Sequence, residues 1–260
     1  MNILDRIVEH KRIEVELRRK AVSLETLVGA EAYSRIPISI SARLNESGAS
    51  GIIAEFKRMS PSKGIINNLV QPDEVTKGYE QSGASAVSIL TDEQFFGGSD
   101  QDILVSRSNL NIPILRKEFI IDPYQIHEAK ALGADLILLI AACLSPNEVK
   151  QFAQLTNSLG MEVLLELHEE EELEHVCDEV QLVGINNRSL KTFDVNIERS
   201  LRMAEQLPGN KIKVAESGID NPAQVKLFRD HGYKGFLIGE NFMKTNDPAA
   251  SLKSFIEKIL

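Results

Sequence analysis

The feature that most constrains the fold of this chain is an eightfold alternation of short apolar runs with helical stretches, which begins near residue 51. Each run is rich in β-branched and apolar residues, and its length is typical of a buried strand. Successive runs start about one βα unit apart. The eight runs cover residues 51–57, 86–91, 112–119, 134–142, 162–168, 182–188, 211–217 and 235–240.

The stretches between the runs carry helix start and stop signals. Asp122 and Pro123 match an N-cap followed by proline at the first helical position, and Gly133 matches the end of that helix. Residues 145–160 begin with a capping box and end with glycine, and residues 220–232 repeat the form. Nearly continuous apolar strands with covering helices indicate a parallel sheet, and eight such units close a (β/α)8 TIM barrel. An open doubly wound sheet is the alternative, but the GxGxxG turn of a dinucleotide fold is absent.

The N-terminal part of the chain does not follow this rhythm. Apolar residues recur at helical spacing over residues 1–20, which predicts an amphipathic packing helix. Residues 21–50 are less regular, with a second helix expected over 38–44. We therefore expect a helical extension over residues 1–50, packed on a barrel over residues 51–260, with both parts in one structural domain.

Composition limits the class of protein and its partners. With 260 residues, 43% of them hydrophobic, the chain can bury the core of a barrel. Its net charge of -9 argues against a nucleic-acid partner. The two cysteines, Cys143 and Cys177, lack metal-type spacing and predict reduced thiols.

The N-terminal sequence has no secretory apolar core, and the longest apolar run, 136–144, is too short to span a membrane. We expect a cytoplasmic protein without a membrane partner. A monomer is the expected state, with a weak homodimer as the alternative.

Polar residues stand at the C-terminal ends of the expected strands, where barrel enzymes place their active sites. Alternate side chains of a strand share a face, so Glu55 lies on the same face as Lys57. On one strand, such charges could simply point to solvent. Their recurrence on five strands favours convergence in the barrel mouth. The converging residues are Glu55 and Lys57 on the first strand, Lys117 on the third, Glu166 on the fifth, Asn186 and Arg188 on the sixth, and Glu216 and Ser217 on the seventh.

The second, fourth and eighth strands carry apolar residues at the corresponding positions, which are Leu90, Leu138, Ile140 and Leu237. Phe96 and Phe119 lie in adjoining loops. The mouth is therefore expected to be polar on one side and apolar on the other. Such a mouth suits a substrate with an aromatic ring at one end and anionic groups at the other, although core packing accounts for the deeper apolar residues.

Glycines after the seventh and eighth strands point to a phosphate site, which recurs at these loops in barrels. Gly218 and Gly239 let backbone N–H groups approach an anion, and Arg188 offers a planar, permanently charged partner. The polar loop over residues 58–64 follows the first strand and contains Ser60. This loop is either a flap over the mouth or a plain connection.

A lysine among carboxylates in a partly closed mouth suits proton transfer. Burial lowers and carboxylates raise the pKa of a lysine, so the direction for Lys117 stays open. A Schiff base on Lys117 is an alternative, as in barrel aldolases. His168 also follows a strand end, but we expect an exposed histidine without a catalytic role. The run 169–172 is expected to be a solvated helix face rather than a metal site.

Seven segments of the chain resemble the indole-3-glycerol-phosphate synthase family. They are IIAEFKRMSPSKG (52–64), SILTDEQFFGGS (88–99), PILRKEFIID (113–122), LGADLILLI (132–140), GINNRSLKTFDVN (184–196), VAESGI (214–219) and FLIGENFM (236–243). The first and third are highly specific in combination, whereas the last two occur in many phosphate-binding barrels. The resemblance covers nearly the whole chain.

The resemblance implies an enzyme without cofactor or metal that acts on an anionic aryl-amino sugar phosphate, 1-(2-carboxyphenylamino)-1-deoxyribulose 5-phosphate. It closes the indole ring and releases carbon dioxide and water. Lys117 would be the general acid on the ribulose carbonyl, Lys57 would pair with the aryl carboxylate and donate a proton at dehydration, and Glu166 would be the base of the later steps. Glu55 would orient the lysines and the substrate amine. Asn186 and Ser217 would hydrogen-bond the reacting part. The implied phosphate and substrate contacts are Ser60, Arg188, Glu216, Gly218 and Gly239, and the implied aryl pocket is Phe96, Phe119, Leu138 and Ile140.

Glu240 departs from the family, in which serine often follows the glycine after the eighth strand. A carboxylate beside a phosphate would repel it. We therefore expect the backbone to bind the phosphate here and the Glu240 side chain to turn away.

Two other functions fit the pattern. One is a different phosphate-binding barrel, such as a phosphoribosylanthranilate isomerase or a Schiff-base aldolase. The other is a non-catalytic barrel kept for binding or assembly. The combined set of Glu55, Lys57, Lys117, Glu166 and Asn186 argues against the non-catalytic barrel.

Overall fold

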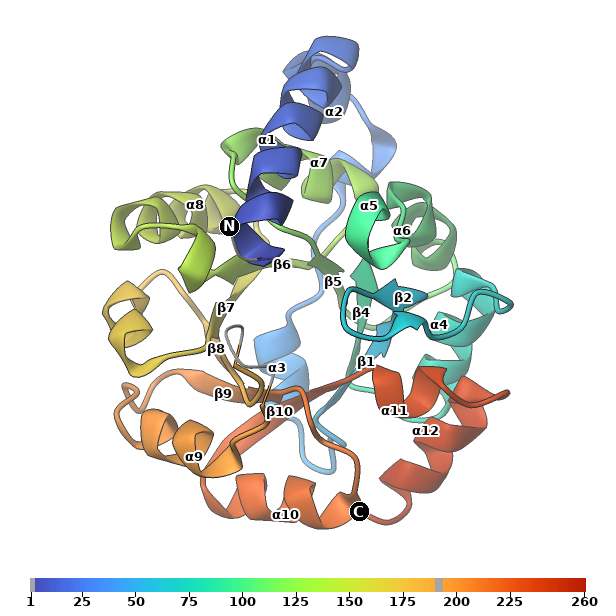
Figure 1. Ribbon diagram of the computed structural model, residues 1–260. Coiled ribbons are helices and arrows are strands. Elements are labelled where there is room, and N and C mark those ends of the chain that lie inside the picture. The colour runs from blue at the N-terminus through green and yellow to red at the C-terminus, as the bar shows by residue number, and fades with distance from the viewer. Residues whose placement is uncertain (1–2, 190–193) are drawn as a thin grey trace.

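The computed structural model describes residues 3–189 and 194–260, and in these residues eight parallel strands form a closed barrel (Figure 1). Neighbouring strands follow the order β1-β10-β9-β8-β7-β6-β5-β4, and β4 pairs back with β1. The predicted (β/α)8 barrel is confirmed, although most strands are shorter than their apolar runs. The strands are β1 (Ile52–Phe56), β4 (Ala86–Leu90), β5 (Ile114–Lys117), β6 (Leu136–Ile140), β7 (Glu162–Leu167), β8 (Leu182–Asn186), β9 (Ile212–Glu216) and β10 (Tyr233–Ile238).

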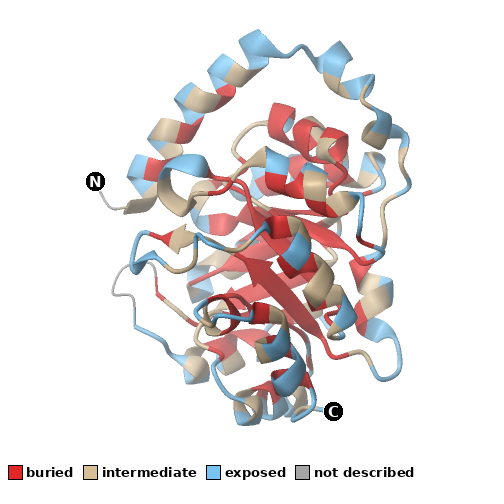
Figure 2. Cartoon of the chain, turned by 90° about the vertical axis from the view of Figure 1, so that its right-hand side faces the viewer, coloured by how far each residue is buried: buried red, intermediate tan, exposed pale blue. Residues whose placement is uncertain are grey.

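Helices surround the barrel and connect its strands. Figure 2 shows buried strands at the centre and helices that are buried toward the strands and exposed toward solvent. The connecting helices are α4 (Pro72–Gln81), α5 (Glu93–Phe96), α6 (Asp100–Arg107), α7 (Pro123–Leu132), η2 (Ala141–Cys143), α8 (Pro146–Ser158), η3 (Glu170–His175), α9 (Ile197–Glu205) and α10 (Pro222–Asp230), with α11 (Glu240–Met243) and α12 (Pro248–Ile256) after the last strand.

Local signals set the ends of these helices largely as expected. Asp122 caps the start of α7, and Gly133 ends it in the left-handed conformation. Ser145 and Glu148 form the predicted capping box of α8. The N-cap of α10 is Asn221, one residue after the predicted start, because its side chain accepts a backbone hydrogen bond from the first turn.

Alternate strand residues fill the barrel interior in layers, because strand side chains point inward with a period of two. One layer comes from β1, β5, β7 and β9 and consists of the buried residues Ile53, Leu115, Leu164 and Val214. Two residues further along the same strands stand Glu55, Lys117, Glu166 and Glu216. The interior is therefore apolar at depth and charged at the mouth.

Four helical elements precede the barrel within residues 3–45. They are α1 (Ile3–Ala21), α2 (Leu24–Val28), η1 (Glu31–Ser34) and α3 (Ile40–Asn45). Helices α1 and α3 match the two expected helices, whereas the short elements α2 and η1 were not predicted. Ile40 and Leu44 of α3 pack into the apolar interior cluster, so α3 closes the end of the barrel opposite the mouth.

Asp135 joins the N-terminal elements to the barrel at this closed end. Its buried carboxylate accepts hydrogen bonds from the backbone N–H of Ile38 (2.7 Å) and of Ile114 (2.8 Å). It also pairs with the guanidinium groups of Arg35 and Arg107. An unpaired buried carboxylate is costly, so these four partners fix the segment before α3 against the start of two strands.

Lys11 joins α1 to the barrel near the mouth. Its Nζ lies 3.0 Å from Asp92 Oδ2, 3.0 Å from Glu118 Oε1 and 2.8 Å from Glu14 Oε2, and the residue is 1% exposed. Burial alone would lower the pKa of Lys11, but the carboxylates outweigh burial and raise it. Lys11 is therefore a charged anchor between α1 and the segments that follow β4 and β5.

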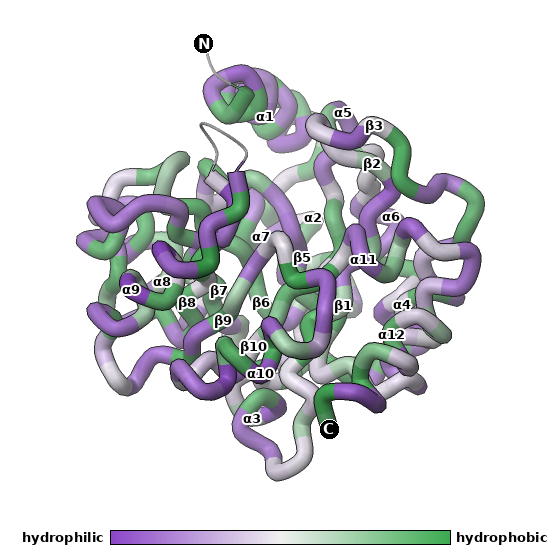
Figure 3. The backbone as a smooth tube through the Cα atoms, turned by 60° about the horizontal axis from the view of Figure 1, so that its bottom comes forward, coloured by the Kyte–Doolittle hydropathy of each residue, from purple (hydrophilic) through white to green (hydrophobic). Residues whose placement is uncertain are grey.

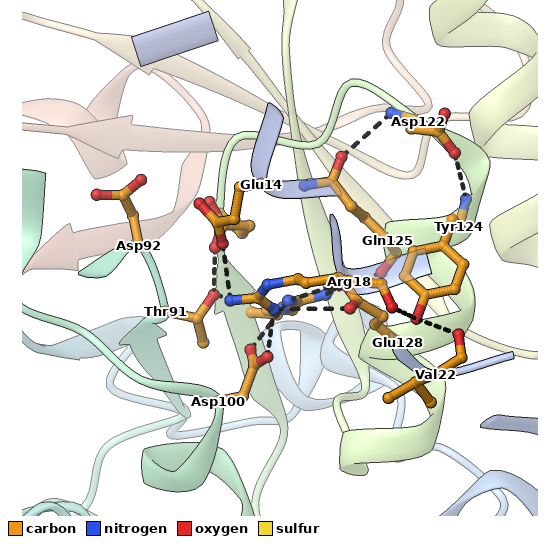
Figure 4. A network of polar contacts seen from close by, with 12 residues as sticks. Glu14, Arg18, Val22, Thr91, Asp92, Asp100, Asp122, Tyr124, Gln125 and Glu128 are labelled. Carbon is orange, nitrogen blue, oxygen red and sulfur yellow. Dashed lines mark hydrogen bonds and ion pairs between the residues drawn. The ribbon is translucent and has the colours of Figure 1, made fainter. Parts of the chain in front are cut away.

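A second ionic network continues along α1 (Figure 4). Arg18 contacts Asp100, and its Nη1 lies 3.6 Å from Glu128 Oε1. The fully buried Arg116 of β5 shares both carboxylates, at 2.9 Å from Asp100 Oδ1 and 3.4 Å from Glu128 Oε2. Figure 3 shows hydrophilic and hydrophobic stretches alternating along α1. The helix thus meets the barrel through buried ion pairs as well as through its apolar face.

The loop after β1 contains a two-stranded antiparallel hairpin that the sequence did not predict. It consists of β2 (Met59–Ser60) and β3 (Gly64–Ile65). Such short strands leave almost no periodic signal in a sequence.

Among the described residues, no helix is both long and apolar enough to cross a membrane.

Candidate active site

A cavity of about 380 Å³ opens at the C-terminal ends of the strands. All fifteen predicted site residues line it. From the central charged group these are Glu55, Lys57, Lys117, Glu166, Asn186, Glu216 and Ser217; from the expected phosphate and aryl ends they are Ser60, Arg188, Gly218, Gly239, Phe96, Phe119, Leu138 and Ile140. Strand alternation accounts for the residues on the strands, the loops after the strands supply the others, and the roles of all of them remain proposals.

Lys117 stands at the centre of a ring of carboxylates. Its Nζ lies 3.1 Å from Glu216 Oε2, 3.5 Å from Glu166 Oε2 and 3.9 Å from Glu55 Oε2. The four residues come from alternate strands, which in a barrel supply one layer of side chains. Lys57, two residues after Glu55, places its Nζ 2.7 Å from Glu55 Oε1.

The carboxylates decide the protonation state of Lys117. Burial alone would lower the pKa of this lysine, but Glu216, Glu166 and Glu55 outweigh burial and raise it. Lys117 is therefore an ammonium at neutral pH. An ammonium can donate a proton, whereas a Schiff-base lysine must be neutral to attack a carbonyl.

The carboxyl groups of this layer differ in pKa. Burial favours the protonated form of each, but the charges of Lys57 and Lys117 lower the pKa of Glu55. Lys117, His168 and Asn186 likewise outweigh burial and lower the pKa of Glu166. The mouth therefore holds these two groups as carboxylates.

For Glu216 the balance is reversed. Its burial and the charge of Glu166 outweigh Lys117 and raise the pKa of Glu216 to about 7. Glu216 Oε1 has no hydrogen-bond partner among the described residues. A Cβ on Gly184, across on β8, would lie 2.0 Å from this oxygen, so the glycine makes room for the Glu216 side chain.

Asn186 is held in one orientation by its neighbours. Its Oδ1 accepts a hydrogen bond from the Arg188 backbone N–H (3.0 Å), which directs its Nδ2 to donate to Glu166 Oε1 (2.7 Å). The guanidinium of Arg199 on α9 donates to the Asn186 carbonyl oxygen (2.9 Å). The amide is thus fixed beside the carboxylate of Glu166.

The apolar wall of the mouth comes from three neighbouring strands. Phe96 and Phe119 contact each other with ring centroids 5.9 Å apart, next to Leu138 and Ile140 of β6. Leu237 of β10, also expected in this wall, lines the same cavity, and β1 lies between β10 and β4 in the order of strands. That the eighth strand completes the apolar wall stays a prediction.

The opposite side of the cavity is formed by the loops after β8, β9 and β10. Ser217 adopts a φ of 64°, an uncommon conformation for a residue with a side chain, and Gly218 follows with a φ of 67°. Asn187 stabilises the turn by donating a hydrogen bond to the Ser217 carbonyl oxygen (2.7 Å). A Cβ on Gly239 would lie 2.6 Å from Glu55 Oε1, so this position has no room for a side chain.

Glu240, the residue that departs from the family pattern, also lines the cavity. Its Oε1 lies 3.7 Å from the Nζ of Lys63 in the loop after β1. Both side chains are about half exposed, so the pair is a weak one. It places a positive charge beside the carboxylate that would otherwise face an anion.

The lining residues that the sequence did not predict include three residues of α1 and one histidine. Ile3, Leu4 and Ile7 reach the cavity from α1, and the amphipathic pattern that predicts this helix does not say where it packs. His168 is 2% exposed and lines the cavity, contrary to the expectation of an exposed histidine. The sequence did contain a signal for His168, because strand alternation puts this residue on the same face as Glu166, two positions earlier.

The model of one protein family, indole-3-glycerol phosphate synthase, matches residues 4–255. Curated relatives carry the same name. A protein of Bacteroides thetaiotaomicron is 49% identical over 259 residues, which is 99% of both chains. A protein of Polynucleobacter necessarius is 42% identical and covers 96% of this chain and 97% of its own, and one of Acinetobacter baumannii is 42% identical and covers 95% and 92%.

Solved structures with a similar fold include tryptophan synthase alpha subunits. The subunit from Legionella pneumophila aligns with a TM-score of 0.62 at 12% identity and covers 85% of this chain and 96% of its own. A mutant alpha subunit from Pyrococcus furiosus aligns with a TM-score of 0.58 at 16% identity and covers 81% and 98%. At this identity, the likeness concerns the barrel fold alone.

Proposed function

This chain belongs to the indole-3-glycerol phosphate synthase family, a family of carboxy-lyases in tryptophan biosynthesis, and we propose residue roles for that reaction in its barrel mouth. The substrate is 1-(2-carboxyphenylamino)-1-deoxyribulose 5-phosphate. The product is indole-3-glycerol phosphate, with loss of carbon dioxide and water. The observation that carries the proposal is the Lys117 ammonium, ringed by carboxylates between an apolar wall and a glycine-lined polar end.

The substrate lies across the mouth in this proposal. Its aryl ring packs on the wall of Phe96, Phe119, Leu138 and Ile140. Its phosphate lies at the other end, held by Ser60, Arg188 and the backbone at Gly218 and Gly239. Stacking an aromatic ring on Phe side chains buries apolar area and fixes its plane. The ribulose carbonyl then falls near the centre of the cavity.

Lys117 acts as the general acid of ring closure. It donates a proton to the ribulose carbonyl oxygen while the aryl carbon that bears the carboxylate attacks the carbonyl carbon. Its raised pKa keeps the proton available at neutral pH. A positioned acid of this kind contributes about 10²- to 10⁴-fold in rate.

Lys57 pairs with the aryl carboxylate before it leaves as carbon dioxide. It then donates a proton to the hydroxyl that departs as water. Glu55 lies 2.7 Å from Lys57 and 3.9 Å from Lys117, so it orients both lysines and can accept a hydrogen bond from the substrate amine.

After the hydroxyl departs, Glu166 accepts a proton from the carbon next to the nitrogen in the new five-membered ring. Loss of this proton completes the indole. The lowered pKa of Glu166 keeps it ionised, and Asn186 orients it. Ser217 and Asn186 hydrogen-bond the reacting part of the substrate. Glu216, with its pKa near neutrality, contacts Lys117 and supplies a further hydrogen bond to the bound substrate.

We also propose that residues 1–50 and 51–260 work as one structural domain, since α1 lines the cavity and is anchored by Lys11. We propose a monomer as the working state, with a weak homodimer as the alternative. Two free cysteines support a reducing location such as the cytoplasm. The acidic net charge of -9 disfavours a nucleic-acid partner.

The test supplies the substrate to the purified protein without added cofactor or metal and follows the rise of indole fluorescence. The chain contains no tryptophan, so the protein contributes little background emission. Formation of indole-3-glycerol phosphate with release of carbon dioxide supports the proposal. Absence of product at enzyme concentrations equal to that of the substrate overturns it.

A further inference from the structure

His168 is a buried histidine beside the proposed base. It follows β7 directly and is 2% exposed. Its Nε2 lies 3.0 Å from Glu166 Oε1, and its Nδ1 lies 4.0 Å from Glu172 Oε2 in η3. The imidazole therefore lies between two carboxylates from consecutive elements of the chain.

Glu172 is itself fixed in place. Its Oε2 accepts hydrogen bonds from the backbone N–H of His168 (2.5 Å) and of Glu169 (3.2 Å), within the capping box that begins η3. The segment 169–172, expected to be a solvated helix face, thus contributes a carboxylate that turns back toward His168. This carboxylate gives the imidazole a fixed negative neighbour on the side away from Glu166.

The surroundings of His168 favour its charged form. Burial alone would lower the pKa of this histidine, but Glu166, Glu172 and the more distant Glu216 outweigh burial and raise it. Lys117 of β5, which lies 3.5 Å from the other oxygen of Glu166, is the positive charge of this cluster. The thiol of Cys143 in η2 stays neutral there, because burial raises its pKa to about 12.

The two oxygens of Glu166 face different partners. Oε1 faces His168 (3.0 Å) and Asn186 (2.7 Å), whereas Oε2 faces Lys117 (3.5 Å). Neither ring nitrogen of His168 has a hydrogen-bond partner of good geometry among the described residues, so its contact with Glu166 is mainly a charge pair. A charge pair on Oε1 leaves Oε2 as the oxygen that points to the centre of the mouth.

Building on the proposed function, we propose that His168, as an imidazolium, is a positioning residue that holds the Glu166 carboxylate with one oxygen toward the substrate and keeps it ionised. Removing the hydrogen-bond partners that orient metal-bound ligands typically costs about 10- to 100-fold in affinity or activity, and we expect an effect of the same order for His168 behind Glu166. The role requires no proton to leave His168 during turnover. It requires a positive charge behind the base.

The kinetic test compares the pH dependence of kcat/KM in wild type, His168→Gln and His168→Leu. Glutamine keeps an N–H donor without the charge, and leucine keeps neither. Loss of the charge raises the pKa of Glu166, so the acidic limb of the profile should move to higher pH in both variants. We expect kcat/KM near neutral pH to fall about 10- to 100-fold in His168→Leu and less in His168→Gln.

His231→Asn is the matched control, since His231 is exposed and, among the described residues, its ring bonds only to the Leu227 carbonyl oxygen. It should keep the wild-type profile. Unfolding temperatures establish that each variant is folded. A lower kcat/KM with an unmoved acidic limb in His168→Gln would identify a merely structural role and overturn the proposal.

A second readout does not depend on turnover. The NMR signal of the His168 imidazole C–H is assigned by its loss in His168→Gln. Its titration midpoint should lie above the ordinary histidine pKa, which is near 6.5. In Glu172→Gln it should titrate at lower pH than in wild type. An ordinary titration in wild type overturns this role alone, whereas a wild-type protein without turnover overturns the proposed function and this role with it.

Discussion

Lys117 Nζ lies 3.5 Å from Glu166 Oε2 at the centre of the barrel mouth, so the proposed acid and the proposed base of the reaction are paired with each other. Each sets the charge of the other. The ammonium helps lower the pKa of Glu166, and the carboxylate helps raise that of Lys117. A substrate that enters between them meets one charged donor and one charged acceptor.

Glu166→Gln should lower kcat about 10²- to 10⁴-fold with a much smaller change in KM, because the amide keeps the shape but cannot accept the proton. The measurement is steady-state formation of indole-3-glycerol phosphate. Glu171→Gln, an exposed neighbour in η3, serves as the control and should behave as wild type. A Glu166→Gln variant with wild-type kcat would remove Glu166 from the mechanism.

Glu216 should make stability depend on pH. Its pKa is raised from 4.5 to about 7, so the stability that its protonated form contributes is complete below pH 4.5 and is lost as the pH rises through 7. Glu216→Gln keeps a neutral side chain throughout. The free energy of unfolding, measured in urea at pH 5 and pH 8, should therefore fall less in Glu216→Gln than in wild type, by on the order of 1–3 kcal/mol. An equal decrease in the free energy of unfolding between pH 5 and pH 8 in the two proteins would show that Glu216 ionises normally.

Gly184→Ala should damage the site from the neighbouring strand. The new Cβ would lie 2.0 Å from Glu216 Oε1 and would displace that carboxyl group from Lys117. We expect kcat to fall at least tenfold, a value typical of a misplaced reacting group. Gly209→Ala is the control, because, apart from its own chain neighbours, no described residue comes within 4 Å of the position of its Cβ. Wild-type turnover in Gly184→Ala would mean that the position of Glu216 is unimportant.

Lys11→Met should separate α1 from the mouth. It leaves Asp92 and Glu118 without their shared positive charge, and Asp92 also caps α5, which carries Phe96. Breaking a buried pair costs about 3–5 kcal/mol, so the unfolding temperature should drop. KM should rise more than kcat falls, since the aryl wall loosens while Lys117 stays.

Lys20→Met is the comparison for this change, because Lys20 lies on the same helix and its ion pair with Glu16 is exposed on both sides. It should alter neither stability nor KM. A Lys11→Met protein with wild-type stability and KM would contradict the anchoring role of Lys11.

The barrel was predictable because its pattern is repeated. Residues such as Glu55 and Lys117 fall at strand ends, and strand alternation alone puts them on the inward face. A closed barrel then brings them together without any knowledge of contacts, which is why the whole predicted set lines one cavity. Prediction succeeded wherever a position in the strand fixes the direction of a side chain.

The rest depends on long-range contacts that no local pattern encodes. The period of α1 predicts a buried face, but only the fold shows that Ile3 and Ile7 end over the mouth. The order of strands around the barrel likewise places β1, with Glu55, between Leu237 of β10 and Leu90 of β4. The pKa of Lys117 depends on three carboxylates from three other strands, so its direction could not be read from the chain.

The measurement that tests the central claim most directly is the turnover of Lys117→Ala, with substrate affinity measured in parallel. If Lys117 is the general acid of ring closure, kcat falls about 10²- to 10⁴-fold, the dissociation constant of the substrate changes far less, and borohydride traps no adduct on wild-type Lys117. Wild-type turnover in Lys117→Ala, or a borohydride-trapped substrate adduct on Lys117, would contradict the account.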